Sequence, residues 1–192
     1  GTNGDYPEIS FTLVWQTVEG MMGVEPDAAR SSLSTIPRLP SDVGRVTVNH
    51  LMLGNQDVSL THQGNTKSIL TNTSSADVTW QARFYASTGN IKVNDQVKAS
   101  VSGVLNGIAY RSVTVVGPAG GSVTAELLAP VDTSSLSDAV SAAGLLSPAG
   151  YTVSSWDSLQ EALTLAQSVL DDPAATQQQV DDAARTVTDA VT

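Results

Sequence analysis

Two histidines and a set of carboxylates are the side chains of this sequence whose chemistry is most often catalytic. His50 and His62 lie in the segments VNHLML and VSLTH, where alternation with apolar residues indicates a satisfied or solvent-facing position on a strand rather than a general base. The chain has no cysteine and neither a His-x-x-x-His nor a His-Glu-x-x-His spacing, so a transition-metal site would need carboxylates for its remaining ligands. We therefore expect no metal site and no cofactor.

The carboxylates do not suggest a catalytic pair. Glycoside hydrolysis requires two carboxyl groups facing each other about 5 to 9.5 Å apart. Glu19 lies beside the apolar face of a predicted helix, and we favour a hydrogen-bonding structural role for it because buried carboxylates are usually paired. The other acidic residues ahead of residue 132 fall mostly at predicted turns and helix caps, where a carboxylate can hydrogen-bond to nearby backbone N–H groups. These residues are Asp5, Glu8, Glu25, Asp27, Asp42, Asp57, Asp77, Asp95 and Glu126.

Other catalytic or phosphate-binding motifs are also missing from the sequence. There is no Gly-x-Ser-x-Gly elbow, and the glycine-rich GPAGGS precedes a predicted strand instead of a helix, so it offers no helix N-terminus for a phosphate. We predict no catalytic residue and do not expect these residues to form an enzyme. A complete small enzyme is the hypothesis that the residues favour least.

Tyr85 and Tyr110 are the candidate ligand-binding residues. In DVTWQARFY the alternation puts Trp80 and Phe84 on one face of a strand and Tyr85 on the other, and Tyr110 lies in a similar strand. Exposed aromatic rings can stack against the C–H faces of sugars, because their flat apolar bodies tolerate a partly wet site. Single exposed aromatic residues are common on sandwiches, so these are weak candidates and a purely structural role stays open.

Charge and composition exclude several partners. Nineteen acidic residues stand against nine basic ones, which gives a net charge of −10 and leaves no basic surface for nucleic acid. No apolar run approaches the roughly 18 residues of a membrane span, so we expect no membrane insertion. Apolar residues make up 41% of the chain and charged residues 15%, a balance typical of a folded protein.

From residue 33 to residue 130 the pattern predicts an antiparallel β-sandwich. Apolar and polar residues alternate in short segments that are separated by turn signals such as LGNQD, NTSSAD and LNG, with no helical run between them. The predicted strands are RVTVNHLML, DVSLTH, DVTWQARFY, VKASVSGV, IAYRSVTVV and SVTAEL.

Residues 131–192 predict three amphipathic helices that pack as a bundle. The apolar period changes to 3.6 in LSDAVSAAGLL, SWDSLQEALTLAQSVL and QQQVDDAARTVTDAV. Ser135 with Asp138, and Thr176 with Gln179, have capping-box spacing, and Tyr151 and Trp156 are expected to anchor the bundle. Residues 132–192 carry nine acidic residues and a single basic one, which we interpret as a solvated helical surface, with a patch for a cationic partner as the alternative.

Residues 1–32 predict a helix and a linker. Apolar residues from Phe11 to Met22 follow the helical period, Asp5 and Glu8 have capping-box spacing, and Gly23 lies where a residue with positive φ ends a helix. The middle of this helix, SFTLVWQTV, is rich in β-branched and aromatic residues, so a strand remains the alternative there.

The helical segment resembles a FIVAR module. The resemblance rests on GYTVSSWDSLQEALTLAQSVLDDPAATQQQVDDAARTVTDAV and covers roughly residues 133–192. It implies a noncatalytic three-helix unit of the kind appended to secreted or wall-attached bacterial proteins, which often are glycoside hydrolases. It also implies export, and carries over no catalytic residue.

The opening segment, with EGMMGVEPDA and IPRLP, is similar to the C-terminal end of bacterial glycosidases built on an (α/α)6 barrel. The resemblance covers about residues 6–40. It implies that the opening helix is the last helix of an upstream catalytic barrel, which would hold the paired acids, and that the sandwich is an accessory domain.

These observations lead to one functional hypothesis and one alternative from another class. We expect a noncatalytic C-terminal accessory region of a secreted or cell-wall-associated glycoside hydrolase, with partners in the upstream catalytic domain and in carbohydrate or cell-wall glycan. The alternative is an adhesin-type module that binds carbohydrate or protein without any catalytic barrel.

Overall fold

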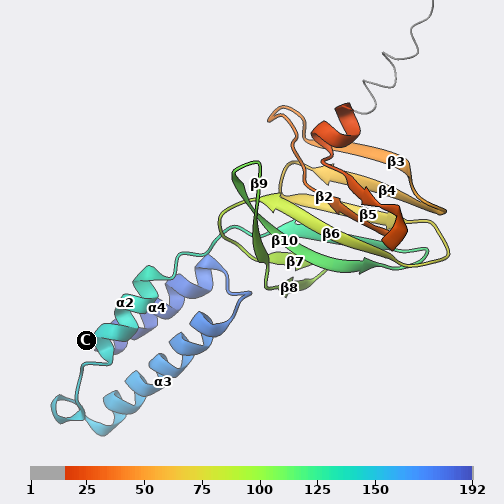
Figure 1. The fold of residues 1–192 in the computed structure, drawn as a ribbon. Coiled ribbons are helices and arrows are strands. Elements are labelled where there is room, and N and C mark those ends of the chain that lie inside the picture. Colours follow the sequence, from red (N-terminus) through yellow and green to blue (C-terminus); the bar gives the residue numbers. More distant parts are fainter. Residues whose placement is uncertain (1–15, 192) are drawn as a thin grey trace, which may run out of the picture. The chain divides into compact units, whose positions relative to one another are not determined.

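The computed structural model describes residues 16–191, which divide after Leu128 into two compact units. The first unit contains two β-sheets and the second contains three α-helices (Figure 1). The predicted fold class, an antiparallel β-sandwich followed by a three-helix bundle in a multidomain all-β plus all-α chain, is therefore confirmed. None of the helices in this described range is long and apolar enough to cross a membrane.

The first sheet has the strand order β1-β2-β6-β10-β9 and the second sheet has the order β3-β4-β5-β11-β7-β8. Neighbouring strands are antiparallel except β2 and β6, which are parallel, a pairing that local alternation does not reveal. The strands of the first sheet are β1 (Glu25–Asp27), β2 (Ser32–Thr35), β6 (Val78–Tyr85), β10 (Ile108–Gly117) and β9 (Val101–Leu105). Those of the second are β3 (Arg45–Leu53), β4 (Gln56–Gln63), β5 (Lys67–Asn72), β11 (Ser122–Leu127), β7 (Ile91–Val93) and β8 (Gln96–Lys98).

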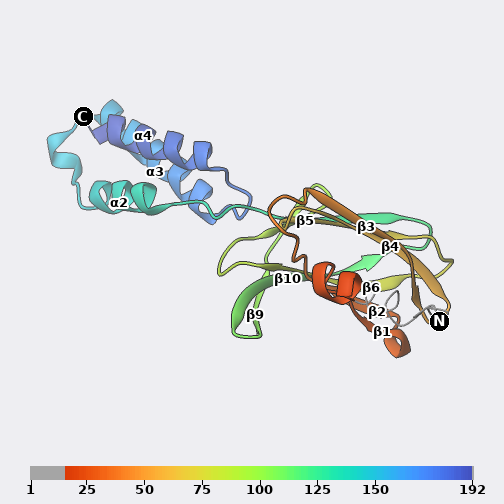
Figure 2. The same cartoon turned by 90° about the horizontal axis from the view of Figure 1, so that it is seen from above.

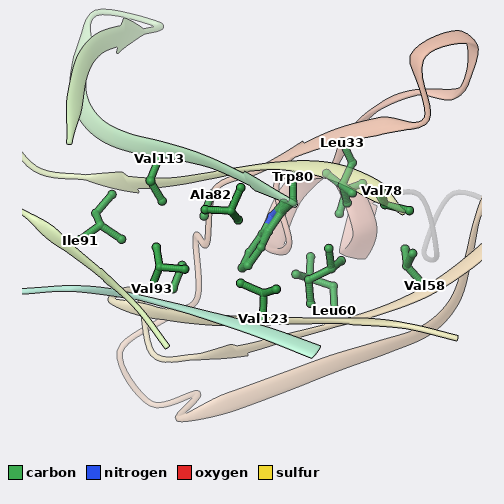
Figure 3. Close-up of a cluster of buried hydrophobic side chains, with 14 of the residues drawn as sticks. Leu33, Val58, Leu60, Val78, Trp80, Ala82, Ile91, Val93, Val113 and Val123 are labelled. Carbon is green, nitrogen blue, oxygen red and sulfur yellow. The ribbon is translucent and has the colours of Figure 1, made fainter. Parts of the chain in front are cut away.

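The core of the sandwich lies between the two sheets and is centred on Trp80 (Figure 3). Val78, Trp80, Ala82 and Phe84 of β6 are all fully buried, as their alternation predicts. The indole Nε1 of Trp80 donates a 2.9 Å hydrogen bond to Oγ1 of Thr35, which is also fully buried. This bond satisfies the polar atom of a large apolar side chain and links β6 to β2.

Residues 22–32 belong to the sandwich, so the predicted linker is wrong for this stretch. Strand β1 and the 3₁₀ turn η2 (Ala28–Arg30) fall within it, and Met22 and Val24 are buried in the sandwich core. Three-residue strands carry too little alternation to stand out from a linker. Met22 therefore packs against the sheets and not on a helix face.

Most of the predicted helix from Asp5 to Gly23 lies outside the described residues, including its cap and the strand alternative over residues 10–15. Within them, Gln16–Met21 (η1) is a π-helical turn. The predicted positive φ of Gly23 is confirmed at 53°. A Cβ at this position would lie 2.1 Å from the carbonyl oxygen of Ile36, and the backbone N–H of Ile36 donates to the carbonyl of Gly23, so glycine allows the chain to enter the sandwich here.

The second unit is a bundle of α2 (Ser134–Ala143), α3 (Val153–Asp171) and α4 (Gln177–Val191). Consecutive helices run in opposite directions (Figures 1 and 2). The short 3₁₀ turn η3 (Pro148–Gly150) lies in the connection between α2 and α3. Small and aliphatic side chains from all three helices fill the core: Leu136, Ala143, Leu159, Ala162, Ala166, Val180, Ala183 and Val187.

One of the two predicted capping boxes is confirmed. Oε1 of Gln179 accepts from the N–H and hydroxyl of Thr176, and Oγ1 of Thr176 accepts from the N–H of Gln179. The capping box predicted at Ser135 is wrong. Helix α2 begins at Ser134, after the N-cap residue Thr133. The N–H and hydroxyl of Ser134 donate to the Asp132 carboxylate.

The aromatic pair of the bundle is also as predicted. The Tyr151 and Trp156 rings pack with their centroids 5.6 Å apart, and Trp156 packs against the bundle core. The hydroxyl of Tyr151 donates to the carbonyl of Val191. The pair therefore anchors the connection before α3 to the end of α4.

His62 is fully buried and has a partner for each ring nitrogen. Nε2 lies 3.0 Å from the carbonyl oxygen of Met22, which can only accept, so Nε2 carries the proton and Nδ1 accepts from the Ser68 hydroxyl at 2.7 Å. Burial lowers the pKa of His62 below its usual value of 6.5, although the hydrogen bond to Met22 opposes this shift. The expected satisfied strand histidine is confirmed.

We expect the Thr35→Val variant to unfold more easily, because it leaves the buried indole N–H of Trp80 without an acceptor. The free energy of unfolding should fall by about 1–3 kcal/mol in urea denaturation, whereas Thr35→Ser should retain most of it. Equal stabilities for the valine and serine variants would contradict a role for this hydrogen bond.

We also expect the sandwich to lose stability below about pH 6.5 because of His62. The lowered pKa means that the unfolded chain binds a proton on this residue that the folded chain does not, so the free energy of unfolding falls as pH drops below the unfolded value and is unaffected above it. Urea denaturation between pH 5 and pH 8 should show this slope in the parent and in His50→Gln, and a smaller one in His62→Gln. An unchanged slope in His62→Gln would show that other groups cause it.

Candidate functional site

Tyr85 and Tyr110 lie directly opposite each other on the outer face of the first sheet. The register of β6 and β10 pairs Tyr85 with Tyr110, and side chains that are opposite in an antiparallel pair point to the same face. Trp80 and Phe84 of β6 point into the core, so the two tyrosines point away from it. Both side chains are half-buried, which leaves part of each ring accessible.

An arginine guanidinium lies over each of these rings. Cζ of Arg83 is 5.5 Å from the centroid of Tyr110, and Cζ of Arg38 is 6.0 Å from the centroid of Tyr85. Both distances are within the range at which a cation is attracted by the face of an aromatic ring. We call the surface formed by Tyr85, Tyr110, Arg38 and Arg83 the tyrosine platform.

Arg83 is held in place by one acceptor on β1 and one on its own strand, β6. Its Nη1 donates to Glu25 of β1 at 2.7 Å, and its Nε donates to Oε1 of Gln81 at 2.8 Å. The same amide oxygen accepts from the hydroxyl of Ser34 on β2. Only 14% of the Arg83 side chain is exposed, compared with 50% for Glu25, so this chain of hydrogen bonds orients the guanidinium with modest gain in stability.

Tyr110 covers a glycine on the adjacent strand. Gly103 of β9 is its cross-strand neighbour, and a Cβ built on Gly103 would lie 2.2 Å from Cζ of the ring. The ring therefore occupies the space that any other side chain would take, an arrangement that stabilises glycine positions in sheets.

Asp27, Asp57 and His50 make hydrogen bonds or ion pairs with neighbouring side chains. Asp27 caps η2 and pairs with Arg30, whose side chain holds the pKa of Asp27 below its usual value. Asp57 contacts Nδ1 of the exposed His50 at 2.8 Å. The cap role predicted for Asp27 is confirmed, whereas Asp57 lies within strand β4 and not at the predicted turn.

Glu126 and Glu19 also differ from their predictions, and Glu126 lies within strand β11 and not at a turn. Glu126 lies between Lys67 and Lys92. The expectation that Glu19 lies beside an apolar face is not supported, because Glu19 is exposed.

The sequence did not single out a hollow at one end of the sandwich. It encloses about 410 Å³ between the β3–β4 turn, the β5–β6 loop and η2. Gln56 lines it, donates from Nε2 to the carbonyl of Asp77, and has an Oε1 that is buried without a partner. The sequence predicts LGNQD and NTSSAD only as two separate turns. Their proximity in the fold depends on strand pairing between residues distant in sequence.

The described residues contain no group of three or more histidine, aspartate or glutamate side chains placed to hold a metal ion. Chemically, the tyrosine platform offers two half-buried aromatic rings, each with a guanidinium over it that carries hydrogen-bond donors. Such a surface suits a ligand with an apolar face and polar substituents.

Comparison with known proteins identifies the helical unit. Residues 133–192 match the family model of the FIVAR domain, so the resemblance of this segment is confirmed, although the match covers less than half of the chain. No curated protein matches the sequence.

Two solved structures are similar to this chain. One is CBM51-2 in complex with GlcNAc and INT domains from Clostridium perfringens ZmpB, with 13% identity, a TM-score of 0.34 and coverage of 76% of this chain and 41% of that one. The other is CBM51-2 and INT domains from the same protein, with 13% identity, a TM-score of 0.33 and coverage of 78% and 42%. The chain thus spans less than half the length of either structure.

We expect Gly103→Ala to destabilise the sandwich, because the new Cβ displaces the Tyr110 ring. The free energy of unfolding should fall by about 1–3 kcal/mol in urea denaturation, and the loss should be smaller when Tyr110 is already alanine. Gly44→Ala is a matched control, because a Cβ there has open space and no positive φ is involved. Equal effects at Gly103 and Gly44 would contradict the packing described.

Proposed function

We propose that this chain is a noncatalytic accessory region that binds carbohydrate on the tyrosine platform. The observation that carries this proposal is the direct opposition of Tyr85 and Tyr110, each with a guanidinium beside it. The C–H face of a sugar ring can stack on such an aromatic surface. Its hydroxyl groups can then accept hydrogen bonds from the two guanidinium groups.

The finer proposal concerns the protein to which this region belongs. The opening segment adjoins the catalytic barrel of a secreted glycoside hydrolase, and the sandwich, residues 33–130 in the sequence-based division, packs on or extends that barrel. The bundle of residues 131–192 spaces the enzyme from glycan or cell wall, or tethers it there. The FIVAR match supports the role of the bundle, and the resemblance of EGMMGVEPDA and IPRLP to a barrel ending supports the upstream domain.

An adhesin-type module is the second candidate, and the tyrosine platform favours it equally because the platform is formed by the sandwich alone. The two candidates differ in what precedes the sandwich in the mature protein. An upstream barrel that changes the thermal unfolding of the sandwich would favour the accessory region, and independent unfolding would favour the adhesin.

The test of carbohydrate binding is a glycan array followed by isothermal titration calorimetry with the 192-residue chain. We expect a binding saccharide to lose about tenfold in affinity in Tyr85→Ala or Tyr110→Ala, because one aromatic contact contributes on the order of 1 kcal/mol. Thr79→Ala is the control, since Thr79 is exposed on the same face of β6.

Two results would contradict the proposal. One is binding that survives both tyrosine substitutions, and the other is the absence of any binding on the array. Turnover of a chromogenic glycoside by the purified chain would overturn the noncatalytic assignment.

A further inference from the structure

Within residues 16–191, Arg38 is the arginine of the tyrosine platform for which no counterion is found. It comes from the segment IPRLP, which follows β2 and passes beside the end of β6. None of the ion pairs found in residues 16–191 includes Arg38, and its Nε is buried without a hydrogen-bond partner. Arg83, by contrast, is neutralised by Glu25 at 2.7 Å.

The backbone around Arg38 is fixed on both sides. Its N–H donates to the carbonyl of Met21 at 2.9 Å. The side chain of Asn65 accepts from the N–H of Leu39 at 2.7 Å and donates to its carbonyl at 2.9 Å. These contacts fix the backbone of Arg38 beside Tyr85 before a ligand arrives, so less backbone entropy is lost on binding.

The platform therefore combines an aromatic surface with one guanidinium that has no ion-pair partner among the described residues, on a chain whose net charge is −10. A guanidinium binds a carboxylate through two parallel hydrogen bonds, and such charge-assisted bonds are stronger than those to hydroxyl groups. A partly buried cation also gains more from a counterion than a fully solvated one.

We propose that the saccharide bound by the tyrosine platform carries a carboxylate, which pairs with the Arg38 guanidinium over Tyr85 while the sugar ring packs against the exposed part of the Tyr85 side chain. This inference rests on the proposed carbohydrate-binding function and names its ligand class. Arg83, whose charge is balanced by Glu25, and the two tyrosine rings contact the ring of the sugar, and Arg38 selects its acidic substituent.

The test uses pairs of oligosaccharides that differ only in the carboxylate. Oligosaccharides ending in glucuronate, galacturonate or N-acetylneuraminate are titrated calorimetrically into the 192-residue chain, alongside their carboxyl-reduced counterparts. We expect at least one acidic member to bind about tenfold more tightly than its reduced counterpart. This preference should shrink as the salt concentration rises from 50 to 300 mM, about the range over which the Debye length becomes comparable to a side chain.

Variants assign the preference to Arg38. Arg38→Gln should remove the difference in affinity between each acidic saccharide and its reduced counterpart. Arg38→Lys should keep part of the preference, because it keeps the charge but not the planar fork. Arg45→Gln removes one positive charge at an exposed position of β3 and should change nothing. Matching thermal unfolding curves show that each variant is folded.

The possible failures are distinguishable. Equal binding of acidic and reduced saccharides, or a preference that survives Arg38→Gln, overturns the acidic ligand and leaves the carbohydrate platform standing. If no saccharide of either kind binds the parent chain, the proposed function fails, and this inference fails with it.

Discussion

The buried contact between Trp80 and Thr35 determines where the outer-face residues lie. The 2.9 Å hydrogen bond from the indole to Oγ1 of Thr35 holds β2 parallel to β6. A buried indole without an acceptor would cost the desolvation of its N–H, so the two strands are constrained to this pairing. The chain leaves β2 directly into IPRLP, and this places Arg38 beside Tyr85 at the end of β6.

The two faces of β6 thus contribute differently to the structure. The inner face supplies the apolar volume that keeps the sheets together, and the outer face carries Gln81, Arg83 and Tyr85 in polar contacts with β1, β2 and β10. Because the inner face fixes register and side-chain direction, the outer face can be organised without large stabilising contacts of its own. A ligand-binding surface on rigid strands loses little entropy when it binds.

Much of this fold follows from local sequence patterns. Alternation in DVTWQARFY assigns Trp80 to the core and Tyr85 to the outer face, and the Asn-Gly of LNG closes the β9–β10 hairpin with both residues at positive φ. Helical periodicity marks α4 from Gln177 to Val191, and the Thr176 cap follows from its spacing to Gln179. These features depend only on neighbours a few residues apart.

The candidate site depends on contacts that are distant in sequence. No local pattern reveals that Tyr85 faces Tyr110, because register in a sheet is set by pairing across a long connection. Arg38 lies in a proline-flanked segment that suggests only a turn, and β2 is too short and its pairing with β6 too remote to be read from alternation. Ser135 has capping-box spacing, but Asp132 and Ser134 form the competing local hydrogen bonds at that helix start.

The most direct test of the central claim is a nuclear magnetic resonance titration that measures the chemical shifts of the Tyr85 and Tyr110 ring protons. On addition of a saccharide that binds the chain, the account predicts that the largest shifts occur at these two rings and at the Arg38 guanidinium, because the sugar stacks on the platform. Largest shifts at Asn55, Gln56 and Ser74, in the hollow at the end of the sandwich, with unchanged tyrosine rings, would contradict it.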